Sequence, residues 1–600
     1  MIANYHGKAS GPAPVKPLNK VGHGKYSHGL TPKFVSPNHP GTVSPLLLLP
    51  FSTLATLSLS LSSWSATLPP VPDPTPPMIL DRLGDFRRDV STSSEEARRW
   101  FDQGMALMLG YNFDGAIASF REATRIDPDF AMAWWGIGYS GGPNQNNPGI
   151  DKPKDEWSYA ASRRAFELRE REQGANRALI EALVVRYNLP LPEDLTEQNK
   201  AYLSAMEKVM KRFPMDPDVL VWTAEAMICM QPWNYWTLEG KPVGRTPEFR
   251  AILERVMRQH PNHPAANHLY IHTMESSPWP ELAEPAADRL VTLVPAAGHL
   301  VHMPSHIWMQ TGRYDDAADC NRRAAALDDA WFEGDPNAGE YRVYMAHNRH
   351  FLAWAATMQG RKREALSASR AIMTEVPAPL MEALASFSDG VAASKWHVMV
   401  RFGMWSEILQ EPSPPEWASV GKAMQHYARG VAYANTGKIN EAMQESGSLD
   451  KAVAALAGTD RNLGNQPASE VMKIAQHVLR GETAFKAGQR EQGLKELRKA
   501  VEIEEKIVYA EPAPWMMPAR HAYGALLVLD GKHGEAEKIF LRDLEIYPAN
   551  GWALLGLRDA LNGQGRSAEA KHADKAFRLA WASADVMPPA ACYCGVAGKR

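Results

Sequence analysis

The feature that most constrains the fold of this 600-residue chain is a helical repeat with a period of about 34 residues. Trp100 and Gly104 recur one period later as Trp134 and Gly138, and helix-like apolar spacing with short breaks continues beyond Asp81. No strand-like alternation persists there. This period is typical of helix–turn–helix units that stack in a row, because one unit cannot bury its apolar face alone. The sequence therefore predicts an all-α repeat array, which also suits a length beyond that of one ordinary domain.

Small, aromatic and proline residues recur in phase in several of these units. They include Ala116, Phe120, Ala123 and Pro128 in an early unit, and Ala536, Phe540, Pro548 and Ala570 near the end. On these residues the chain resembles the tetratricopeptide family over most of Glu95–Ser583. The resemblance implies tetratricopeptide-type helical hairpins stacked into a right-handed superhelix, an α-solenoid. Turns between paired helices are expected at Gly312, Gly360, Gly403, Gly437, Gly488 and Gly531.

The segment 1–80 differs in composition from the rest of the chain. Through Pro72 the chain has no Asp or Glu, and lysines precede an apolar, Ser-rich stretch within residues 45–66. Basic, then apolar, then small residues is the order of a secretory signal, so we expect an exported protein, periplasmic or secreted. A disordered tail, another targeting peptide or a misassigned start codon are alternatives, and the protein would otherwise be cytoplasmic. Residues 81–583 are expected to form the superhelix, and residues 584–600 a tail containing Cys592 and Cys594.

The composition is that of an ordinary soluble protein, with 45% hydrophobic and 22% charged residues and a net charge of −3. Because there is no basic excess, we expect no nucleic-acid partner. The apolar stretch is short and interrupted by Ser and Thr, so no membrane span is expected in the mature chain. Four cysteines do not make a disulfide framework, although Cys592 and Cys594 could pair or bind a metal.

The histidines carry the strongest functional signal. His268 and His272 are followed, one repeat later, by His302 and His306. A spacing of four places each pair on one helix face, and the repeat places the two faces side by side. The tetratricopeptide resemblance implies that such positions line the concave side of the array. Phased in this way, nine histidines share that wall: His268, His272, His299, His302, His306, His347, His350, His397 and His521.

Two segments carry a closer resemblance. Asn267–His272 followed by Glu275, and then Gly298–His306, are similar to a bacterial tetratricopeptide family that is rich in histidine. The resemblance supports the fold and draws attention to units 264–360, but it implies no reaction.

Imidazoles that project from packed helices can share a metal ion, because such helices lie about 8–10 Å apart. We predict metal ligands among eight of the nine: His268, His272, His302, His306, His299, His347, His350 and His397. Glu275 could be a ligand, a partner that fixes an imidazole tautomer, or a general base. Tyr270 is the second candidate for a catalytic role, since its hydroxyl could lie near the groove.

Two hypotheses follow. In the first, the protein is a metalloenzyme in which copper or iron would support oxidative chemistry on a small molecule, and zinc would activate water for hydrolysis. Oxidative chemistry is the favoured form, and the sequence does not choose the metal. In the second, the protein is a non-catalytic scaffold that binds a peptide or a partner protein in its concave groove. The central units offer histidine rather than Lys or Arg to such a partner, which favours the metal hypothesis.

Overall fold

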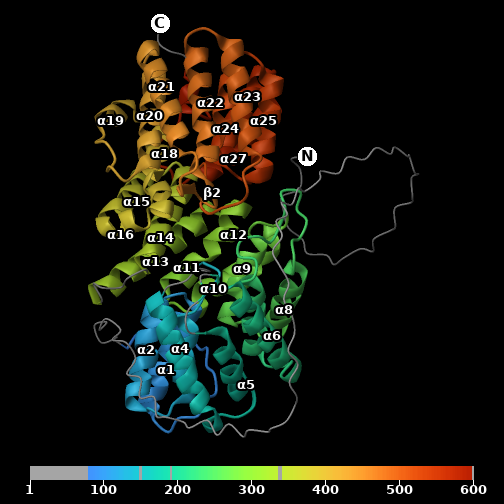
Figure 1. Ribbon diagram of the computed structural model, residues 1–600. Coiled ribbons are helices and arrows are strands. Elements are labelled where there is room, and N and C mark those ends of the chain that lie inside the picture. Colours follow the sequence, from blue (N-terminus) through green and yellow to red (C-terminus); the bar gives the residue numbers. More distant parts are fainter. Residues whose placement is uncertain (1–78, 147–151, 189–191, 193, 335–340, 597–600) are drawn as a thin grey trace, which may run out of the picture. The chain divides into compact units, whose positions relative to one another are not determined.

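The computed structural model describes residues 79–146, 152–188, 192, 194–334 and 341–596. The apolar stretch at 45–66 therefore lies outside the described residues, as does nearly all of the segment 1–80. In the described part the chain is helical almost throughout, which confirms the all-α prediction (Figure 1). None of the helices there is long and apolar enough to span a membrane.

Helices in the N-terminal half alternate with short turns and loops. They are α1 (Glu95–Leu109), α2 (Phe113–Ile126), α3 (Ala131–Ser140), α4 (Lys152–Glu167), α5 (Gly174–Leu183), α6 (Thr196–Arg212), α7 (Pro217–Ile228), α8 (Thr246–Gln259), α9 (Pro264–Met274), α10 (Glu284–Leu293), α11 (Gly298–His302), α12 (Pro304–Thr311) and α13 (Tyr314–Gly334).

The C-terminal half continues in the same way, with one small hairpin of strands. Its helices are α14 (Arg342–Met358), α15 (Lys362–Glu375), α16 (Ala378–Ala383), α17 (Ala385–Ala392), α18 (Ser394–Arg401), α19 (Trp405–Gln410), α20 (Ser419–Asn435), α21 (Ile439–Leu456), α22 (Ala468–Lys486), α23 (Arg490–Glu504), α24 (Ala519–Leu529), α25 (His533–Ile546), α26 (Gly551–Gly563) and α27 (Ser567–Ala580). The antiparallel strands are β1 (Asn462–Leu463) and β2 (Gln466–Pro467).

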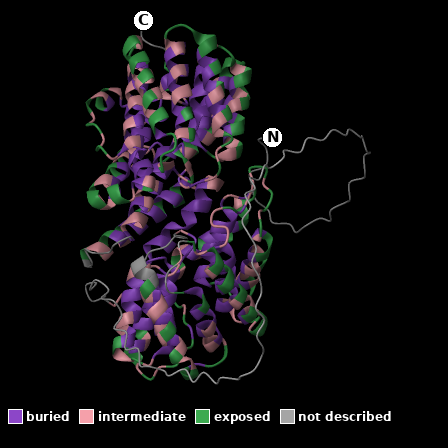
Figure 2. Ribbon diagram, in the orientation of Figure 1, coloured by how far each residue is buried: buried purple, intermediate pink, exposed green. Residues whose placement is uncertain are grey.

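The helices pack as hairpins that stack on the next hairpin. Helix α1 contacts α2 and α3, α20 contacts α21 and α22, and α24 contacts α25 and α26. This is the pattern of tetratricopeptide-type units, in which each pair buries its apolar face against its neighbours. One continuous hydrophobic core follows the helices along the chain, as the buried residues in Figure 2 show.

Glycines at two kinds of position support the repeat. All six of the predicted turn glycines adopt left-handed backbone conformations that side-chain-bearing residues rarely adopt, which confirms those turns. Where α1, α2 and α3 meet, a Cβ atom at Gly104 would lie 2.6 Å from the ring of Phe120, and one at Gly136 would lie 2.7 Å from the same ring. The phenylalanine therefore fills the space that these two glycines leave between the helices.

The C-terminal segment packs against the array. Tyr593 lies over Gly403, where a Cβ atom would be 2.4 Å from its ring. Cys592 and Cys594 are joined by a disulfide bond, whereas Cys229 and Cys320 are buried free thiols. The tail predicted for residues 584–600 is thus ordered through residue 596.

Candidate metal centre

Six histidine side chains converge from four helices. Helix α9 supplies His268 and His272, α11 supplies His299 and His302, α12 supplies His306, and α14 supplies His347. Helices α9, α11 and α12 occupy the middle of Figure 1, and α9 contacts α12.

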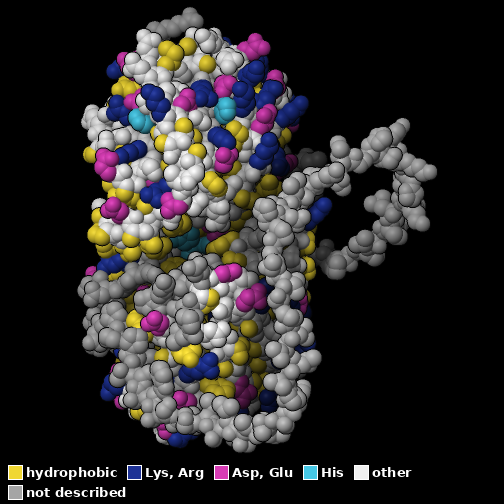
Figure 3. Space-filling model, viewed as in Figure 1, with side chains coloured by type: hydrophobic (Ala, Val, Ile, Leu, Met, Phe, Trp, Pro, Cys, Tyr) yellow, Lys and Arg dark blue, Asp and Glu magenta, His cyan; other side chains and the backbone are white. Residues whose placement is uncertain are grey.

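The six side chains lie in the interior rather than on an open wall. Five of them are at most 2% exposed, and His347 is half-buried. The exposed groove expected from the sequence is therefore replaced by an enclosed cluster. On the face seen in Figure 3, histidine side chains are visible in a hollow bordered by hydrophobic side chains.

The local sequence explains how α9 and α11–α12 present their histidines. Pro264 begins α9, which is buried on all sides, so both members of its His pair face other helices. Pro304 begins α12 directly after α11, and the hydroxyl of Ser305 donates to the carbonyl oxygen of His302 at 2.8 Å. The break between the two short helices leaves the spacing of four between His302 and His306 on one face.

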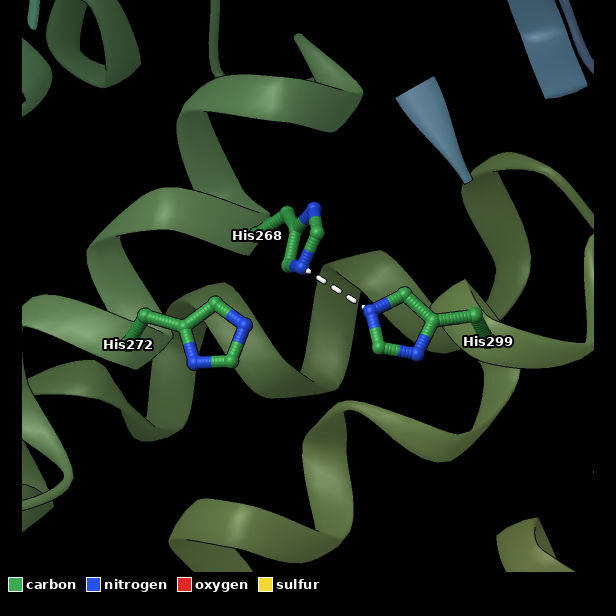
Figure 4. Close-up of side chains that lie close together, drawn as sticks. All are labelled: His268, His272 and His299. Carbon is green, nitrogen blue, oxygen red and sulfur yellow. Dashed lines mark hydrogen bonds between the residues drawn. The ribbon is translucent and has the colours of Figure 1, made fainter. Parts of the chain in front are cut away.

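His268, His272 and His299 form the first cluster, which we call group A (Figure 4). Their candidate ligand atoms lie within 4.8 Å of one another, and the Nε2 atoms of His268 and His299 are 3.2 Å apart. If an ion lay about 2.0–2.1 Å from both of these nitrogens, the nitrogen–metal–nitrogen angle would be about 100°, which is close to the tetrahedral angle.

His302, His306 and His347 form the second cluster, group B. The Nε2 atoms of His302 and His306 are 2.8 Å apart. With the same metal–nitrogen distances the angle at a shared ion would be about 85°, which four- to six-coordinate transition metals adopt.

Hydrogen bonds fix which nitrogen of His302 carries the proton. The amide nitrogen of Asn321 donates to the carbonyl oxygen of Ala317 at 2.8 Å, so its oxygen Oδ1 faces the imidazole. That oxygen is 2.6 Å from Nδ1 of His302 and can only accept. The proton of neutral His302 therefore lies on Nδ1, and the lone pair of Nε2 points into group B.

Glu275, at the end of α9, links the two groups. Its Oε1 lies 3.1 Å from Nδ1 of His272, and its Oε2 lies 2.7 Å from Nδ1 of His306. A carboxylate in this position holds both Nδ1 protons and turns both Nε2 lone pairs toward the groups. Nε2 of His272 is buried and has no hydrogen-bond partner among the described residues.

When Glu275 is ionised and accepts from Nδ1 of His306, the Nε2 atoms of His302 and His306 are two hydrogen-bond acceptors held 2.8 Å apart. Such a pair repels unless a proton or a metal ion lies between the two nitrogens. Burial, followed by the charge that His306 would add, lowers the pKa of His302 well below its usual range. Burial also lowers the pKa of His268 and of His347 to about 3. A metal ion bound between the two Nε2 atoms would satisfy both nitrogens, and imidazole nitrogens are common ligands of transition metals.

Glu511 is a residue of the candidate centre that the sequence did not predict. It lies in the segment between α23 and α24, and its carboxylate contacts Nδ1 of His306 and accepts a hydrogen bond from the hydroxyl of Tyr509. Burial alone would raise the pKa of Glu511, but His306 and its hydrogen bonds to Glu275 and Tyr509 hold it below its usual range. Burial, followed by the nearby Glu511, raises the pKa of Glu275 well above its usual range.

Aromatic rings enclose the two groups. Tyr111 stacks on His299 with ring centroids 5.5 Å apart and meets His268 edge-on at 4.7 Å. Phe351 stacks on His306 at 4.7 Å, and Trp233 meets His272 edge-on at 5.2 Å. These contacts keep the imidazoles apart from bulk water and fix the planes of their rings.

Four of the residues that the sequence singled out lie elsewhere. Tyr270 is not part of the cluster: its hydroxyl is 3.1 Å from Oε1 of Glu254 on α8, because two residues along a helix turn a side chain to the opposite face. His350 and His397 belong to neither histidine group among the described residues and line a separate pocket. His521, the ninth histidine of the predicted wall, lies 2.7 Å from Asp543 instead.

No family model and no curated protein matches the chain. Among solved structures, it is similar to the human IFIT1 dimer with m7Gppp-AAAA, at 14% identity and a TM-score of 0.29 over 82% of this chain and 91% of that one. It is also similar to the APC/C hetero-tetramer Cut9-Hcn1, at 11% identity and a TM-score of 0.27 over 83% of this chain and 79% of that one. Values this low carry no argument about ligands or activity, and the tetratricopeptide-type fold rests on the helices themselves.

Proposed function

We propose that this chain is a metalloprotein in which groups A and B each hold a transition-metal ion, and that it acts as an oxidoreductase on a small molecule. The observation that carries the proposal is the pair of buried Nε2 atoms of His302 and His306, which lie 2.8 Å apart while Nδ1 of each ring faces a hydrogen-bonding partner. Packing alone gives no reason to bury two imidazole nitrogens against each other.

A two-ion site is supported by the closeness of the groups. The rings of His272 and His306 have centroids 5.5 Å apart, and those of His299 and His302 are 5.8 Å apart. Ions that work together are about 3.5–4 Å apart in two-metal enzymes. Glu275 contacts one histidine of each group, so it could bridge two ions or hold the two imidazoles in register.

The donor set limits the metal. Neutral imidazole nitrogens suit copper, iron and zinc, and among divalent ions of this series copper is bound most tightly. The buried, aromatic surroundings suit a redox-active ion whose reactive states must be shielded from water. With zinc, the same groups would activate water for hydrolysis, and Glu275 would be the candidate general base.

Elemental analysis of the protein purified without a histidine tag tests the proposal. We expect about two equivalents of metal after supplementation with copper, iron or zinc, as in two-metal enzymes. The double variant His268→Ala/His302→Ala should lose most of it. The control is His426→Ala, because His426 is a half-buried histidine that contacts Glu445 outside both groups. Two copper(II) ions in adjacent groups should also couple magnetically and weaken the electron paramagnetic resonance signal.

Less than about a tenth of an equivalent in the supplemented parent protein would overturn the metal proposal, since a real site must approach full occupancy. Recovery of a tightly bound peptide from such a metal-free protein would favour the scaffold hypothesis. Full metal content in the double variant would show that the ligands are other residues.

A further inference from the structure

A second pocket lies beside the candidate metal centre. It is lined from α14, α17, α18, the β1–β2 hairpin and the segment after α23, and it encloses about 380 Å³ of empty space, part of it open to solvent. Its lining includes His350, Phe387, His397, Leu463, Glu511 and Met516.

The polar atoms of this pocket lack protein partners. Both ring nitrogens of His397 and Nδ1 of His350 are buried without a hydrogen-bond partner among the described residues, and the side chain of His397 is 3% exposed. Burial, together with the charge of Arg401, lowers the pKa of His397 to about 3, so its ring is neutral. Buried polar atoms of this kind are normally satisfied, which indicates a ligand or ordered water in the pocket.

The charge and shape of the lining restrict the ligand. The pocket has one acidic residue, Glu511, and no Lys or Arg among its described lining residues, so an anion would be repelled. The remaining walls are apolar or aromatic, including Phe387, Val391 and Leu463. A neutral imidazole offers one donor and one acceptor, which a hydroxyl group can match with its own acceptor and donor.

The pocket connects the metal centre with an apolar entrance. Glu511 lines it and also contacts His306 of group B. On the other side, Phe387 and Val391 are shared with a neighbouring apolar pocket that includes Leu380 and Met381, and Phe387 is 38% exposed. An organic molecule could therefore enter past Phe387 and place its polar end next to group B.

We propose that this pocket binds an uncharged, mostly apolar molecule that carries a hydroxyl group, with the hydroxyl bonded to His397 and His350 and the apolar part against Phe387, Val391 and Leu463. The idea that this ligand is the substrate of the metal centre rests on the proposed function. The idea that the pocket binds a ligand rests only on the residues that line it. His350 and His397 are then substrate-binding residues rather than the metal ligands that the sequence predicted.

Binding of 4-fluorophenol to the full chain, followed by fluorine NMR, tests the proposal. His397→Leu removes both ring nitrogens, and we expect the Kd of 4-fluorophenol to rise about tenfold or more, which corresponds to the loss of one or two hydrogen bonds. The matched control His426→Leu should leave the Kd unchanged. Fluorobenzene lacks the hydroxyl and 4-fluorobenzoate carries a charge, so both should bind at least about tenfold more weakly to the parent protein.

A second variant, Val391→Phe, reduces the space in the pocket without touching a histidine, and it should also weaken binding of 4-fluorophenol. Equal Kd values in the parent and in both variants would overturn the proposal, as would equally tight binding of 4-fluorobenzoate. The measurement is made on chelator-treated and on zinc-loaded protein. If the chain holds no metal but binds 4-fluorophenol in a way that depends on His397, only the proposed function is refuted. If the chain holds metal but neither substitution changes the Kd of 4-fluorophenol, only the proposed pocket is refuted.

Discussion

Replacing Asn321 by Leu probes the step on which the metal proposal depends. Asn321 is fully buried on α13, and its oxygen Oδ1 accepts from Nδ1 of His302 at 2.6 Å while its amide donates to Ala317 at 2.8 Å. Leucine has a similar volume but no acceptor. The substitution therefore leaves the metal-facing side of His302 untouched and removes only the group that fixes its tautomer.

Two effects of this substitution can be given a size. In the metal-free protein it leaves the buried Nδ1 proton of His302 without an acceptor, which costs about 1–3 kcal/mol of unfolding free energy. In the metal-loaded protein, loss of a partner behind an imidazole ligand typically weakens metal binding about 10–100-fold. The loss should fall on group B alone, because among the described residues the hydrogen bonds of the Asn321 side chain reach His302 and no member of group A.

Calorimetric titration of the metal-free protein with Zn²⁺ separates the two groups, since zinc does not change oxidation state. We expect two tight sites in the parent, and in Asn321→Leu one tight site and one weakened about 10–100-fold. Asn321→Asp keeps an acceptor next to His302 and should restore most of the affinity. Asn435→Leu is the control, because its amide also donates four residues back along its helix, to Val431 at 3.0 Å, but lies outside both groups.

Unchanged affinity at both sites of Asn321→Leu would refute the argument from tautomers. Equal weakening in Asn435→Leu would show that the loss reflects a less stable fold rather than the position of His302. Unfolding by urea, measured on the same metal-free samples, records the cost to stability separately.

Three further predictions concern the fold, a buried carboxyl group and a rejected site residue. Gly104→Val should lower the unfolding free energy by about 1–3 kcal/mol in a urea titration, because its Cβ would lie 2.6 Å from the ring of Phe120; an unchanged midpoint would contradict that packing. Burial raises the pKa of Glu482 to about 7, so its carboxyl group favours folding while protonated and this stability is lost as the pH rises from about 4.5 through 7. The difference in unfolding free energy between Glu482→Gln and the parent should therefore grow by about 2–3 kcal/mol in favour of the variant as the pH rises from 5 to 8. A difference that does not change with pH would rule this out. Tyr270→Phe should leave metal content and zinc affinity unchanged, since its hydroxyl contacts Glu254; loss of metal would restore it to the site.

The sequence predicted the fold and much of the cluster for the same reason. One repeat period relates successive units, so residues at matching positions of adjacent units come close together once the hairpins stack. His268 and His302 lie at such positions, and His272 and His306, four residues farther on, lie on the same helix faces. Farther along the chain the period no longer predicts which side chains meet. His397 lines another pocket, because units of unequal length change the position of matching residues on neighbouring helices.

The residues that the sequence missed come from outside the helices that carry the histidines. Glu511 lies far from His306 along the chain and reaches it through an irregular segment. No periodicity connects such a segment to a helix face, so only the three-dimensional packing brings it there. Asn321 lies on the second helix of its own unit. From sequence alone, a polar residue there is interpreted as a packing or solvent-facing residue, because its hydrogen-bond partner is not known.

Backbone conformation gives independent support to a built site. Apart from glycines, four described residues have positive φ angles, and two of these are Tyr111 at 56° and Trp233 at 62°. This conformation costs a large aromatic residue about 1–3 kcal/mol, and it persists only where the surroundings impose it. Both rings touch histidines of group A: Tyr111 contacts His268 and His299, and Trp233 contacts His272. Two left-handed turns from separate parts of the chain thus each bring an aromatic ring onto the same three imidazoles.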